Sequence, residues 1–455
     1  MNLIIIGAGK VGDTLIANLI NENHDIVVVD IDDAKVQNVV NRYDVNGIAG
    51  AGLERSVLLD AGVEKADFVI ACTAQDEMNI LCSVLAKKLG AKYTIARVRD
   101  PRYFAEMENV KDVLGLDFFF NPELQTGKEI AQVMKFPSAR SVESFAGGKA
   151  TMVEFTVKPN SYLCYKSLMG LSRESKSSFL VAMVRRGDDV IIPRGDFVLN
   201  ENDVVYLIAD DAEMSAIMKK LQMHKDRAKA VFIIGGGKIA YYLAQELIKS
   251  GVDVKIVERD NARAVELSQI LPKATVLCFD ATDHQALEEE QLKNSDACVT
   301  LTGMDEENVI ISMYAKEMGV NKVVTKVDRQ SVLNMVKKLG LDTVVSPSNV
   351  IANHIVRFVR AHLADTGNGI NTLYKMHGKA EALEFTVTEK FTELGVPLKK
   401  LGVKEGVLIG GVVRGEQFIL PDGDTSLQVG DQVIVVIKKF NYDNKQVYGK
   451  IVAKW

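Results

Sequence analysis

The stretch NLIIIGAGKVG, residues 2–12, decides the fold of the first half of this chain. The apolar run at 3–6 has the pattern of a buried strand, and it leads directly into Gly7, Gly9 and Gly12. In a G-x-G-x-x-G turn, the first glycine permits a tight turn, the second lets the backbone approach a pyrophosphate, and the third lets the helix pack on the strand. The stretch therefore predicts the first strand, glycine turn and helix of a Rossmann-like, nucleotide-binding sheet.

The same pattern returns near the middle of the chain, where AVFIIGGGKIA occupies residues 230–240. When Gly7 is placed on Gly235, Asp30 falls on Glu258, and the later stretches TAQDEMN and TGMDEEN align with one residue more. The stretch EFTV and a P-x-G-D block (PRGDFVLNENDVV and PDGDTSLQVGDQV) also recur in the second half. The chain is therefore predicted to be a duplicated pair of units, each with a large and a small domain.

The large unit of each half alternates apolar strands with amphipathic helices. In the first half, further strands are expected at 25–30, 68–72 and 93–98. Near-continuous apolar strands separated by helices predict a parallel sheet that is covered on both faces. The smaller unit has short alternating stretches with RRGDD and PRGD turns, which predict hairpins. The predicted fold class is α/β, with two Rossmann-like parallel-sheet domains, each followed by a small α+β domain.

Helix-start signals mark the ends of the large units. Asn121 is a good N-cap with Pro122 as the first helical residue, and Ser346 and Pro347 repeat the signal. The expected order is a nucleotide-binding domain at 1–121, a helix and linker at 122–141, a small domain at 142–226, a second nucleotide-binding domain at 227–346, a helix and linker at 347–370, and a second small domain at 371–455. Loops or linkers are also expected at 147–149 and 365–369.

Length and composition exclude several classes of protein. The chain has 455 residues, a net charge of −5 and no basic domain, so nucleic-acid binding is not expected. No window reaches the ~18–20 consecutive apolar residues of a membrane span, and the N-terminus lacks the pattern of a signal peptide. The five cysteines form no C-x-x-C pair, which is typical of reduced thiols in a cytosolic protein.

Two acidic residues extend the nucleotide-binding pattern. Asp30 and Glu258 each end a predicted second strand, where a carboxylate can accept hydrogen bonds from ribose hydroxyls. Because a carboxylate there repels a 2′-phosphate, NAD(H) or an adenine nucleotide is favoured over NADP(H). Lys10 and Lys238 directly follow the glycines, and each either contacts a phosphate or remains solvated.

Residues at the carboxyl ends of the fourth and fifth strands extend the candidate sites, since ligands of open parallel sheets lie at that edge. Arg97 and Lys326 end the fifth strands, and each is a candidate ligand contact or a surface cation. Asp76 and Asp305 precede apolar helices and are either helix caps or ligand contacts. The backbone of two dipeptides is expected to pass close to the ligand: Thr73-Ala74 and Thr302-Gly303.

No cluster of residues suggests catalysis. A dehydrogenase needs a proton relay beside the nicotinamide, often a histidine, but the six histidines occupy no equivalent positions in the two halves. The H-E-x-x-H, G-x-S-x-G and Walker motifs are absent from the sequence. The sequence therefore predicts two sensor sites with no catalytic residue and no metal, rather than an enzyme.

These features together resemble the TrkA family, in which a KTN (RCK_N) nucleotide-binding domain precedes a small RCK_C (TrkA-C) domain. The resemblance covers nearly the whole chain and is carried by GAGKVG with Asp30, GGGKIA with Glu258, the paired T-x-x-D-E-x-N stretches, and the twin EFTV and P-x-G-D blocks. It implies a cytoplasmic regulatory subunit, peripheral on the inner face of the plasma membrane, under a membrane-embedded potassium transporter of the Trk type. Such subunits form dimers or tetrameric rings, and nucleotide binding changes the assembly and gates ion flow.

The resemblance also assigns the ligands and the site residues. NAD(H) is expected to bind, with ATP or ADP as further candidates. The helices from Pro122 and Pro347 correspond to the crossover helices of the family. The first site would comprise Gly7, Ala8, Gly9, Lys10, Val11, Asp30, Ala51, Thr73, Ala74 and Arg97. The second site would comprise Gly235, Gly236, Gly237, Lys238, Ile239, Glu258, Asp280, Ala281, Thr302, Gly303 and Lys326.

The two halves depart differently from the family pattern. An acidic G-D-A-T loop often follows the third strand; the second half keeps Asp280 in FDATD, whereas the first half has Ala51 in GAGLE. The two sites are therefore expected to prefer different nucleotides. The alternatives are a regulator of another cation channel or transporter, an NAD-dependent dehydrogenase, and a redox-responsive repressor. The nucleotide at each site, the direction of gating, the ring stoichiometry, the transporter and any ligand of the small domains remain open at this point.

Overall fold

The computed structural model describes residues 1–20, 24–175, 179–223, 228–336, 339–341, 343–363, 370–376, 379–389, 391, 393–403 and 406–438. The expected loop at 365–369 and two of the histidines, His224 and His377, lie outside these residues. The chain divides into two compact units, one built from Met1–Ile130 with Lys229–Val356 and the other from Ala131–Ala228 with Arg357–Trp455. The first unit therefore holds both large domains, and the second holds both small ones.

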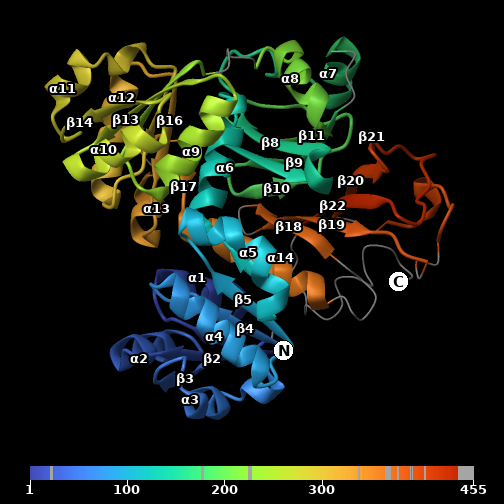
Figure 1. Ribbon diagram of the computed structural model, residues 1–455. Helices are drawn as coiled ribbons and strands as arrows, with labels where there is room; N and C mark the ends of the chain where they lie inside the picture. The colour runs from blue at the N-terminus through green and yellow to red at the C-terminus, as the bar shows by residue number, and fades with distance from the viewer. Residues whose placement is uncertain are drawn as a thin grey trace. The chain divides into compact units, whose positions relative to one another are not determined.

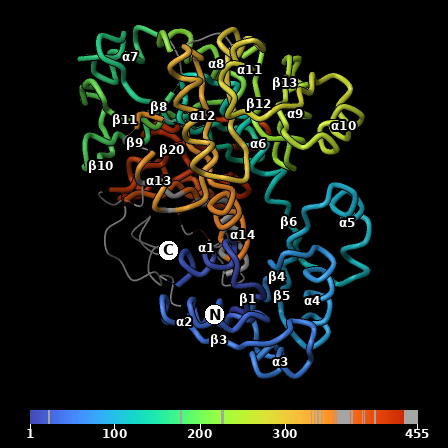
Figure 2. The backbone as a smooth tube through the Cα atoms, turned by 90° about the vertical axis from the view of Figure 1, so that its left-hand side faces the viewer, coloured from blue at the N-terminus to red at the C-terminus, as the bar shows by residue number. Residues whose placement is uncertain are grey.

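The first large domain is a six-stranded parallel sheet in the order β3-β2-β1-β4-β5-β6. Its strands are β1 Asn2–Ile6, β2 Asp25–Asp30, β3 Asn46–Ala49, β4 Phe68–Ala71, β5 Tyr93–Arg97 and β6 Phe118–Phe120. Its helices are α1 Lys10–Leu19, α2 Asp33–Arg42, α3 Arg55–Asp60, α4 Asp76–Lys88, α5 Pro101–Leu114 and α6 Pro122–Lys135. This doubly wound sheet, with helices on both faces (Figures 1 and 2), confirms the predicted Rossmann-like fold.

The second large domain repeats this topology in the order β14-β13-β12-β15-β16-β17. Its strands are β12 Ala230–Ile234, β13 Asp253–Glu258, β14 Thr275–Cys278, β15 Ala297–Thr300, β16 Lys322–Lys326 and β17 Thr343–Val345. Its helices are α9 Lys238–Lys249, α10 Asn261–Ile270, α11 His284–Glu289, α12 Asp305–Glu317, α13 Gln330–Val336 and α14 Pro347–Leu363. The central strands are buried on both faces, which explains why they read as unbroken apolar runs.

The small domains are antiparallel sheets in the orders β10-β9-β11-β8-β7 and β18-β19-β22-β20-β21. The elements of the first are β7 Ser141–Phe145, β8 Ala150–Thr156, α7 Leu168–Ser175, β9 Leu180–Arg186, β10 Asp189–Ile191, β11 Val204–Asp210 and α8 Asp211–Lys220. The strands of the second are β18 Ile370–Met376, β19 Ala380–Thr386, β20 Val407–Arg414, β21 Gln417–Ile419 and β22 Gln432–Lys438. The α+β class predicted for these domains is confirmed.

One detail of the small domain differs from the sequence prediction. The RRGDD turn does form a hairpin, between β9 and β10. The PRGD stretch at 193–196 does not, because it lies in the connection from β10 to β11, and β11 pairs with β9 instead. The stretch Gly147-Gly148-Lys149, expected as a loop or linker, is a tight turn between β7 and β8, since Phe145 pairs with Ala150.

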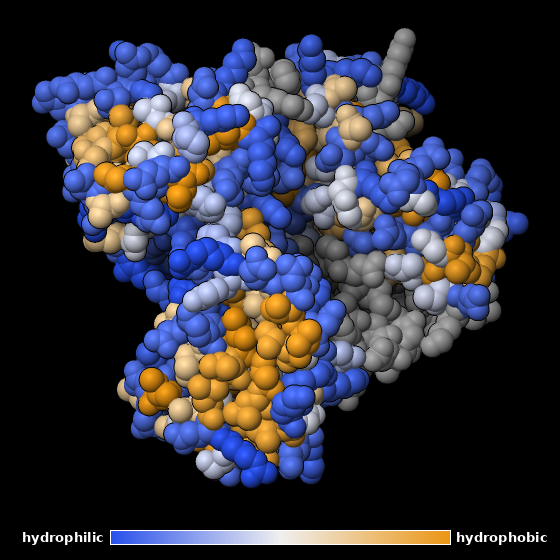
Figure 3. Space-filling model, viewed as in Figure 1, coloured by the Kyte–Doolittle hydropathy of each residue, from blue (hydrophilic) through white to orange (hydrophobic). Residues whose placement is uncertain are grey.

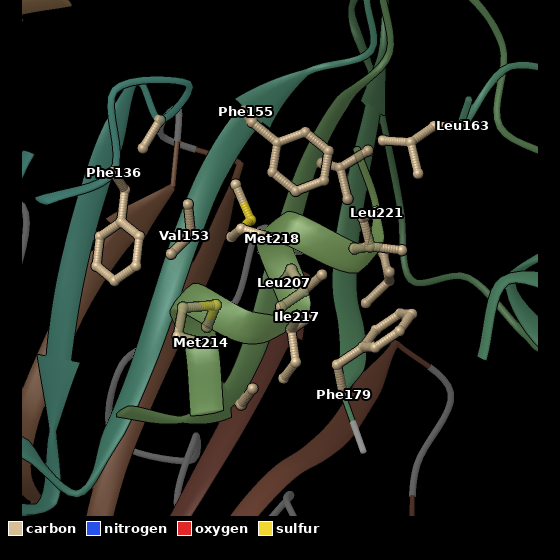
Figure 4. Packing of buried hydrophobic residues seen from close by; sticks show 14 of the residues in the cluster. Phe136, Val153, Phe155, Leu163, Phe179, Leu207, Met214, Ile217, Met218 and Leu221 are labelled. Atoms are coloured by element: carbon tan, nitrogen blue, oxygen red, sulfur yellow. The ribbon is translucent and has the colours of Figure 1, made fainter. Parts of the chain in front are cut away.

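The core of the first small domain lies between its sheet and α8. Apolar side chains of α8 face β8 and β11 (Figure 4), among them Met214, Ile217 and Met218 against Val153, Phe155 and Leu207. A second cluster joins the two small domains, with Phe145, Tyr206, Met376 and Ile434 all buried in it. The side chain of Glu384, from the second EFTV stretch, accepts a hydrogen bond from the backbone N–H of Ala146 at 2.8 Å.

The repeated P-x-G-D blocks end in a buried ion pair in each small domain. Asp203 is 1% exposed and accepts two hydrogen bonds from the Arg186 guanidinium, at 2.9 and 2.8 Å. Asp431, also 1% exposed, is bound in the same way by Arg414. The motif is therefore structural, since it ties the connection before β11 or β22 to the neighbouring strand.

Candidate functional sites

The first candidate site is a cleft of about 420 Å³ at the carboxyl edge of the first parallel sheet. Strands β1, β2 and β4 end there and turn away into loops, so backbone N–H groups and side chains converge on one point. Its predicted lining residues are Gly7, Gly9, Lys10, Val11, Asp30, Ala51, Thr73, Ala74 and Arg97. Ala8 does not line the cleft.

The second candidate site is the equivalent cleft of the second sheet, with a volume of about 230 Å³. Its predicted lining residues are Gly235, Gly236, Gly237, Glu258, Asp280, Ala281, Thr302 and Gly303. Lys238, Ile239 and Lys326 were predicted for this site but do not line it. The glycine turn, the acid and the loops after the third and fourth strands are thus brought together in both halves.

The three glycines of the first turn have different neighbours. Gly7 has a φ of +112°, and a Cβ there would lie 3.0 Å from the backbone of Cys72. A Cβ on Gly12 would lie 2.0 Å from the carbonyl oxygen of Gly7, so α1 can only pack this closely on the turn with glycine at that position. A Cβ on Gly9 would meet nothing within 4 Å, and Gly237 is equally open. The middle glycine of each turn therefore faces free space at a helix N-terminus, as an approaching phosphate requires.

The acid at the end of the second strand holds the glycine turn in place. Asp30 accepts hydrogen bonds from the N–H groups of Ala8 at 2.7 Å and Asp32 at 2.9 Å. Glu258 makes the same pair of contacts, with Gly236 at 2.8 Å and Asp260 at 2.9 Å. Each carboxylate oxygen has a second lone pair, so both acids can also accept hydrogen bonds from a ribose.

The residue between the first two motif glycines, Ala8 or Gly236, differs in size between the two halves, and the helix packed beside it differs as well. A Cβ on Gly236 would lie 2.4 Å from Leu267 and 2.9 Å from the Glu258 carboxylate. The first half has Ala8 at that place, and the position equivalent to Leu267 is Val39, whose side chain is one carbon shorter. The change from alanine to glycine between the two turns therefore follows the packing against these helices, and Gly236 lines its cleft whereas Ala8 does not.

Sequence reasoning missed two asparagines that set the edge of each cleft. Asn79 is fully buried, accepts the N–H of Thr73 at 2.7 Å and donates to the carbonyl of Arg97 at 3.0 Å. Asn308 makes the equivalent bonds to Thr302 and Lys326, at 2.8 and 3.1 Å. Their place as the last residue of the repeated T-x-x-D-E-x-N stretch was the available signal.

Asp76 and Asp305 have a third role that was not among the two expected. The Asp76 carboxylate accepts the backbone N–H groups of Arg99 and Asp100 at 2.8 and 2.7 Å, and it does not line the cleft. Asp305 accepts the backbone N–H groups of Asp328 and Arg329, the latter at 2.8 Å. Burial alone would raise the pKa of Asp305, but these hydrogen bonds outweigh it and lower the pKa. Each aspartate therefore fixes the loop that follows the fifth strand.

The cations that end the fifth strands bind the loop after the fourth strand. The Arg97 guanidinium donates to the carbonyl of Thr73 at 2.7 Å, and burial lowers the pKa of Arg97. Lys326 donates to the carbonyl of Thr302 at 2.9 Å. Arg97 is longer and reaches the first cleft, whereas the Lys326 ammonium ends at the loop and does not reach the second.

The walls of the two clefts differ in chemistry. Cys72 and Cys82 line the first cleft, where burial raises their pKa values to about 12 and about 11, so both remain protonated thiols. Met78 of the first cleft is replaced by Glu307 in the second, and Ala51 by Asp280. The second cleft is therefore smaller and more acidic than the first.

Comparison with known proteins agrees with this arrangement. Residues 3–122 and 231–347 match the TrkA-N domain, and residues 152–222 and 383–443 match the TrkA-C domain. The Trk system potassium uptake protein TrkA homolog 1 of Methanosarcina mazei is 34% identical over 444 residues, which are 96% of this chain and 97% of that protein. The Trk system potassium uptake protein TrkA of Halomonas elongata is 33% identical over 443 residues, 96% of each chain.

Solved structures show the same fold at lower sequence identity. The GsuK RCK domain has a TM-score of 0.64 at 17% identity and covers 100% of this chain and 95% of that one. The GsuK channel bound to NAD has a TM-score of 0.63 at 17% identity and covers 99% and 79%. The duplicated domain order, the near full-length matches to curated relatives and the two matched clefts lead to one conclusion: this chain belongs to the TrkA family.

Proposed function

We propose that this protein is a regulatory subunit that binds NAD(H) or an adenine nucleotide in each cleft and thereby gates a Trk-type potassium-uptake transporter. The observation that carries the proposal is the pairing, in both halves, of an open glycine turn with an acid at the end of the next strand. The names of the relatives support the potassium-uptake system as the partner. A cation channel or another transporter is the alternative partner, because the same sensor would serve it.

The geometry suits a dinucleotide or nucleoside phosphate without a 2′-phosphate. The N-termini of α1 and α9 direct free N–H groups and a positive helix end at the open space beside Gly9 and Gly237. The carboxylates of Asp30 and Glu258 repel an added phosphate on the ribose. We assign the more phosphate-rich ligand to the first cleft, because Lys10 and Arg97 line it and an acid from the third-strand loop does not.

We assign no catalytic role to either cleft. Reduction of a substrate by NADH needs a proton donor beside the nicotinamide. The titratable side chains at the cleft walls are acids, cations and the high-pKa thiols of the first cleft, and no histidine lines either cleft among the described residues. NADH is therefore expected to act as an effector that leaves the protein unchanged.

The protein is proposed to work in the cytoplasm, at the inner face of the plasma membrane through the transporter. The nucleotides that it would sense are cytoplasmic, and its five cysteines are all free thiols, as in a reducing compartment. Among the helices of the described ranges, none combines the length and the apolar character of a membrane crossing.

Copies of the chain are proposed to associate through an apolar face on each large domain. On the first domain Leu81 of α4 and Val113 of α5 are 52% and 88% exposed, and Figure 3 shows the apolar area over these helices. The second domain repeats it with Ile310 and Met313 of α12, 59% and 43% exposed. Contiguous exposed apolar surface of this kind marks protein–protein contacts, which fits a dimer or a tetrameric ring.

A charge in this face should lower the association state. In the Leu81→Glu/Val113→Glu double variant, association would bury two carboxylates that have no oppositely charged neighbour, and this raises the free energy of the associated state. Sedimentation velocity should show smaller species than for the native protein. Val265→Glu is the control, because Val265 is 50% exposed on α10, a helix that is not part of the proposed face. Equal sedimentation of the double variant and the native protein would contradict an interface at α4 and α5.

The proposed binding mode is tested by closing the phosphate position. Gly9→Ala and Gly237→Ala each put a methyl group into the open space of one cleft without touching another atom. Each should weaken nucleotide binding at its own cleft by roughly 10–100-fold, since displacing a phosphate from one backbone N–H costs about 1.5–3 kcal/mol. The thermal unfolding midpoint should not change.

Calorimetric titration with NAD⁺, NADH, ATP and ADP measures both clefts at once. The native protein should give two binding events, and each variant should lose one of them. Gly195→Ala is the matched control, since its new Cβ would make an ordinary 3.6 Å contact in the small domain. NADH should be recovered intact when oxo acids are added; consumption of NADH would instead favour a dehydrogenase. If the native protein binds none of the four nucleotides, the proposed function is wrong.

A further inference from the structure

The start of α6 carries a buried polar contact between the two large domains. Asn121 is fully buried and donates from Nδ2 to the Tyr242 hydroxyl of α9 at 2.9 Å. The same amide donates to the carbonyl of Arg99 at 3.2 Å, while its oxygen caps α6 by accepting the N–H of Leu124 at 2.9 Å. Asn121 thus fixes the first turn of α6 to the first domain and to the second domain at once.

The two helices pack closely beside this contact. A Cβ on Gly127 would lie 3.0 Å from the backbone nitrogen of Leu243 and 3.1 Å from the Cβ of Tyr242. A larger residue there would force α6 or α9 to shift, because these contacts are tighter than nearly all real Cβ contacts. Small movements at the start of α6 must therefore be transmitted to α9, because packed interiors have few voids to absorb them.

One end of this contact reaches the first cleft. Arg97 lines that cleft, and its Nε is buried without a hydrogen-bond partner. Glu123, in the first turn of α6, also has a buried and unpartnered oxygen. Burial raises the pKa of Glu123, and the charges of Arg99, Arg97 and Lys238 oppose that shift. Glu123 therefore lies within the electrostatic reach of a cation from each half of the chain.

The other end reaches the second glycine turn. Lys238 begins α9 directly after Gly237, and Tyr242 follows one helical turn later on the same side. Lys238 does not line the second cleft. Its charge instead helps to hold the pKa of Asp100, in the first domain, at about 2, where the Arg102 side chain makes the largest contribution. The lysine expected to meet a phosphate is thus within electrostatic range of two carboxylates of the other half, Asp100 and Glu123.

We propose that Asn121, Glu123 and Tyr242 form a polar link that couples the two clefts. The proposal rests on the proposed nucleotide binding at both sites. A phosphate in the first cleft attracts Arg97 and lowers its electrostatic attraction for Glu123, to which no hydrogen bond ties it. The attraction of Glu123 for Lys238 is then less opposed, and Asn121 passes the resulting movement of α6 to Tyr242 of α9, the helix that begins at the second glycine turn. Occupation of the first cleft therefore lowers the affinity of the second, and by linkage the reverse also holds.

The link is present on one side of the duplicated domain pair. At the start of α14, Ser348 replaces Glu123 and donates within its own domain to Asp328 at 3.3 Å. Thr14 replaces Tyr242 and donates to the carbonyl of Lys10 at 2.8 Å. The residues at the positions of Glu123 and Tyr242 thus bond within their own domains.

The test is to measure NADH binding at the second cleft with the first cleft filled or blocked. In the native protein at saturating NADH, the second event should be at least about fivefold weaker than in Gly9→Ala, the low end of typical coupling. Tyr242→Phe keeps the ring and removes the hydroxyl, so the two dissociation constants should then agree within about twofold. Glu123→Gln should give the same result through a different atom.

Tyr241→Phe is the matched control. Tyr241 precedes Tyr242 on α9 and binds Gln245 of its own helix at 2.8 Å, so the coupling should persist in this variant. Two NADH events with equal affinities in native protein and Gly9→Ala would overturn the link and leave the proposed function standing. Coupling that survives both Tyr242→Phe and Glu123→Gln would also overturn it. Absence of any NADH binding to the native protein would overturn the link together with the proposed function.

Discussion

Replacing Asp30 by alanine is expected to weaken nucleotide binding at the first cleft by roughly 100–10,000-fold. The carboxylate would accept two ribose hydroxyls, and hydrogen bonds to a charged group contribute about 1.5–3 kcal/mol each. The substitution also frees the N–H of Ala8, which Asp30 holds at 2.7 Å, so the glycine turn loses its tether to β2. Both effects lower affinity. Glu258→Ala should do the same at the second cleft, through Gly236.

Calorimetric titration of both variants separates the two clefts. Asp30→Ala should retain the second binding event, and Glu258→Ala the first. Asp32→Ala is the control, because the Asp32 carboxylate caps α2 two residues away and does not line the cleft. It should cost about 1 kcal/mol of helix stability and leave nucleotide affinity within about threefold. Unchanged binding in Asp30→Ala would show that the ligand does not reach the acid. Nucleotide-dependent potassium transport should be blunted in parallel.

Replacing Arg186 by methionine should destabilise the first small domain by about 3–5 kcal/mol, because Asp203 is then left as an unpaired buried charge. Arg186 supplies both nitrogen donors to that carboxylate, and the backbone N–H of Asn200 alone remains, at 2.7 Å. The guanidinium also lies 4.9 Å from the ring centroid of Phe197 in a cation–π contact, which the uncharged methionine side chain would lose. Arg414→Met should destabilise the second small domain equally through Asp431.

Urea unfolding followed by circular dichroism measures this effect. The small-domain transition should move to lower urea concentration in Arg186→Met, while nucleotide binding in the large domains is kept. Arg173→Met removes an exposed arginine from α7 of the same domain and should unfold like the native protein. If Arg186→Met and Arg173→Met unfold together, the buried ion pair does not stabilise the domain.

The sequence predicted the parallel sheets because their signal is local. An apolar run that ends in a glycine turn can be recognised without knowing what packs against it. Asp30 and Glu258 could also be found, because each lies at the end of the next strand, 23 residues after the first glycine. Lys238, Ile239 and Lys326 do not line the second cleft, and their part in ligand binding stays a prediction. The resemblance assigned these positions, whereas in the structure the Lys326 ammonium donates to the Thr302 carbonyl and Lys238 is within electrostatic range of Glu123 in the other large domain.

Contacts between distant segments were beyond prediction. Tyr242 has no twin in the first half, so the comparison of repeats did not mark it, and its bond to Asn121 joins positions 121 residues apart in sequence. Asn79 was missed because its side chain bonds to backbone atoms of two different loops, and such geometry leaves no periodic pattern. The PRGD turn was misread because a turn sequence does not reveal which strand is the next neighbour in the sheet.

The closeness of α6 to α9 has a consequence for symmetry. In a homodimer of a half-length chain, every contact across the twofold axis must occur twice, and every substitution changes both copies together. Joining the halves in one polypeptide removes that constraint. Asn121 could pair with Tyr242 while Ser346 and Thr14 kept their own local partners. In a fused chain the two binding sites can therefore differ in sequence, so that binding at one site changes the affinity of the other. The two sites of a symmetric homodimer are identical in sequence and cannot differ in this way.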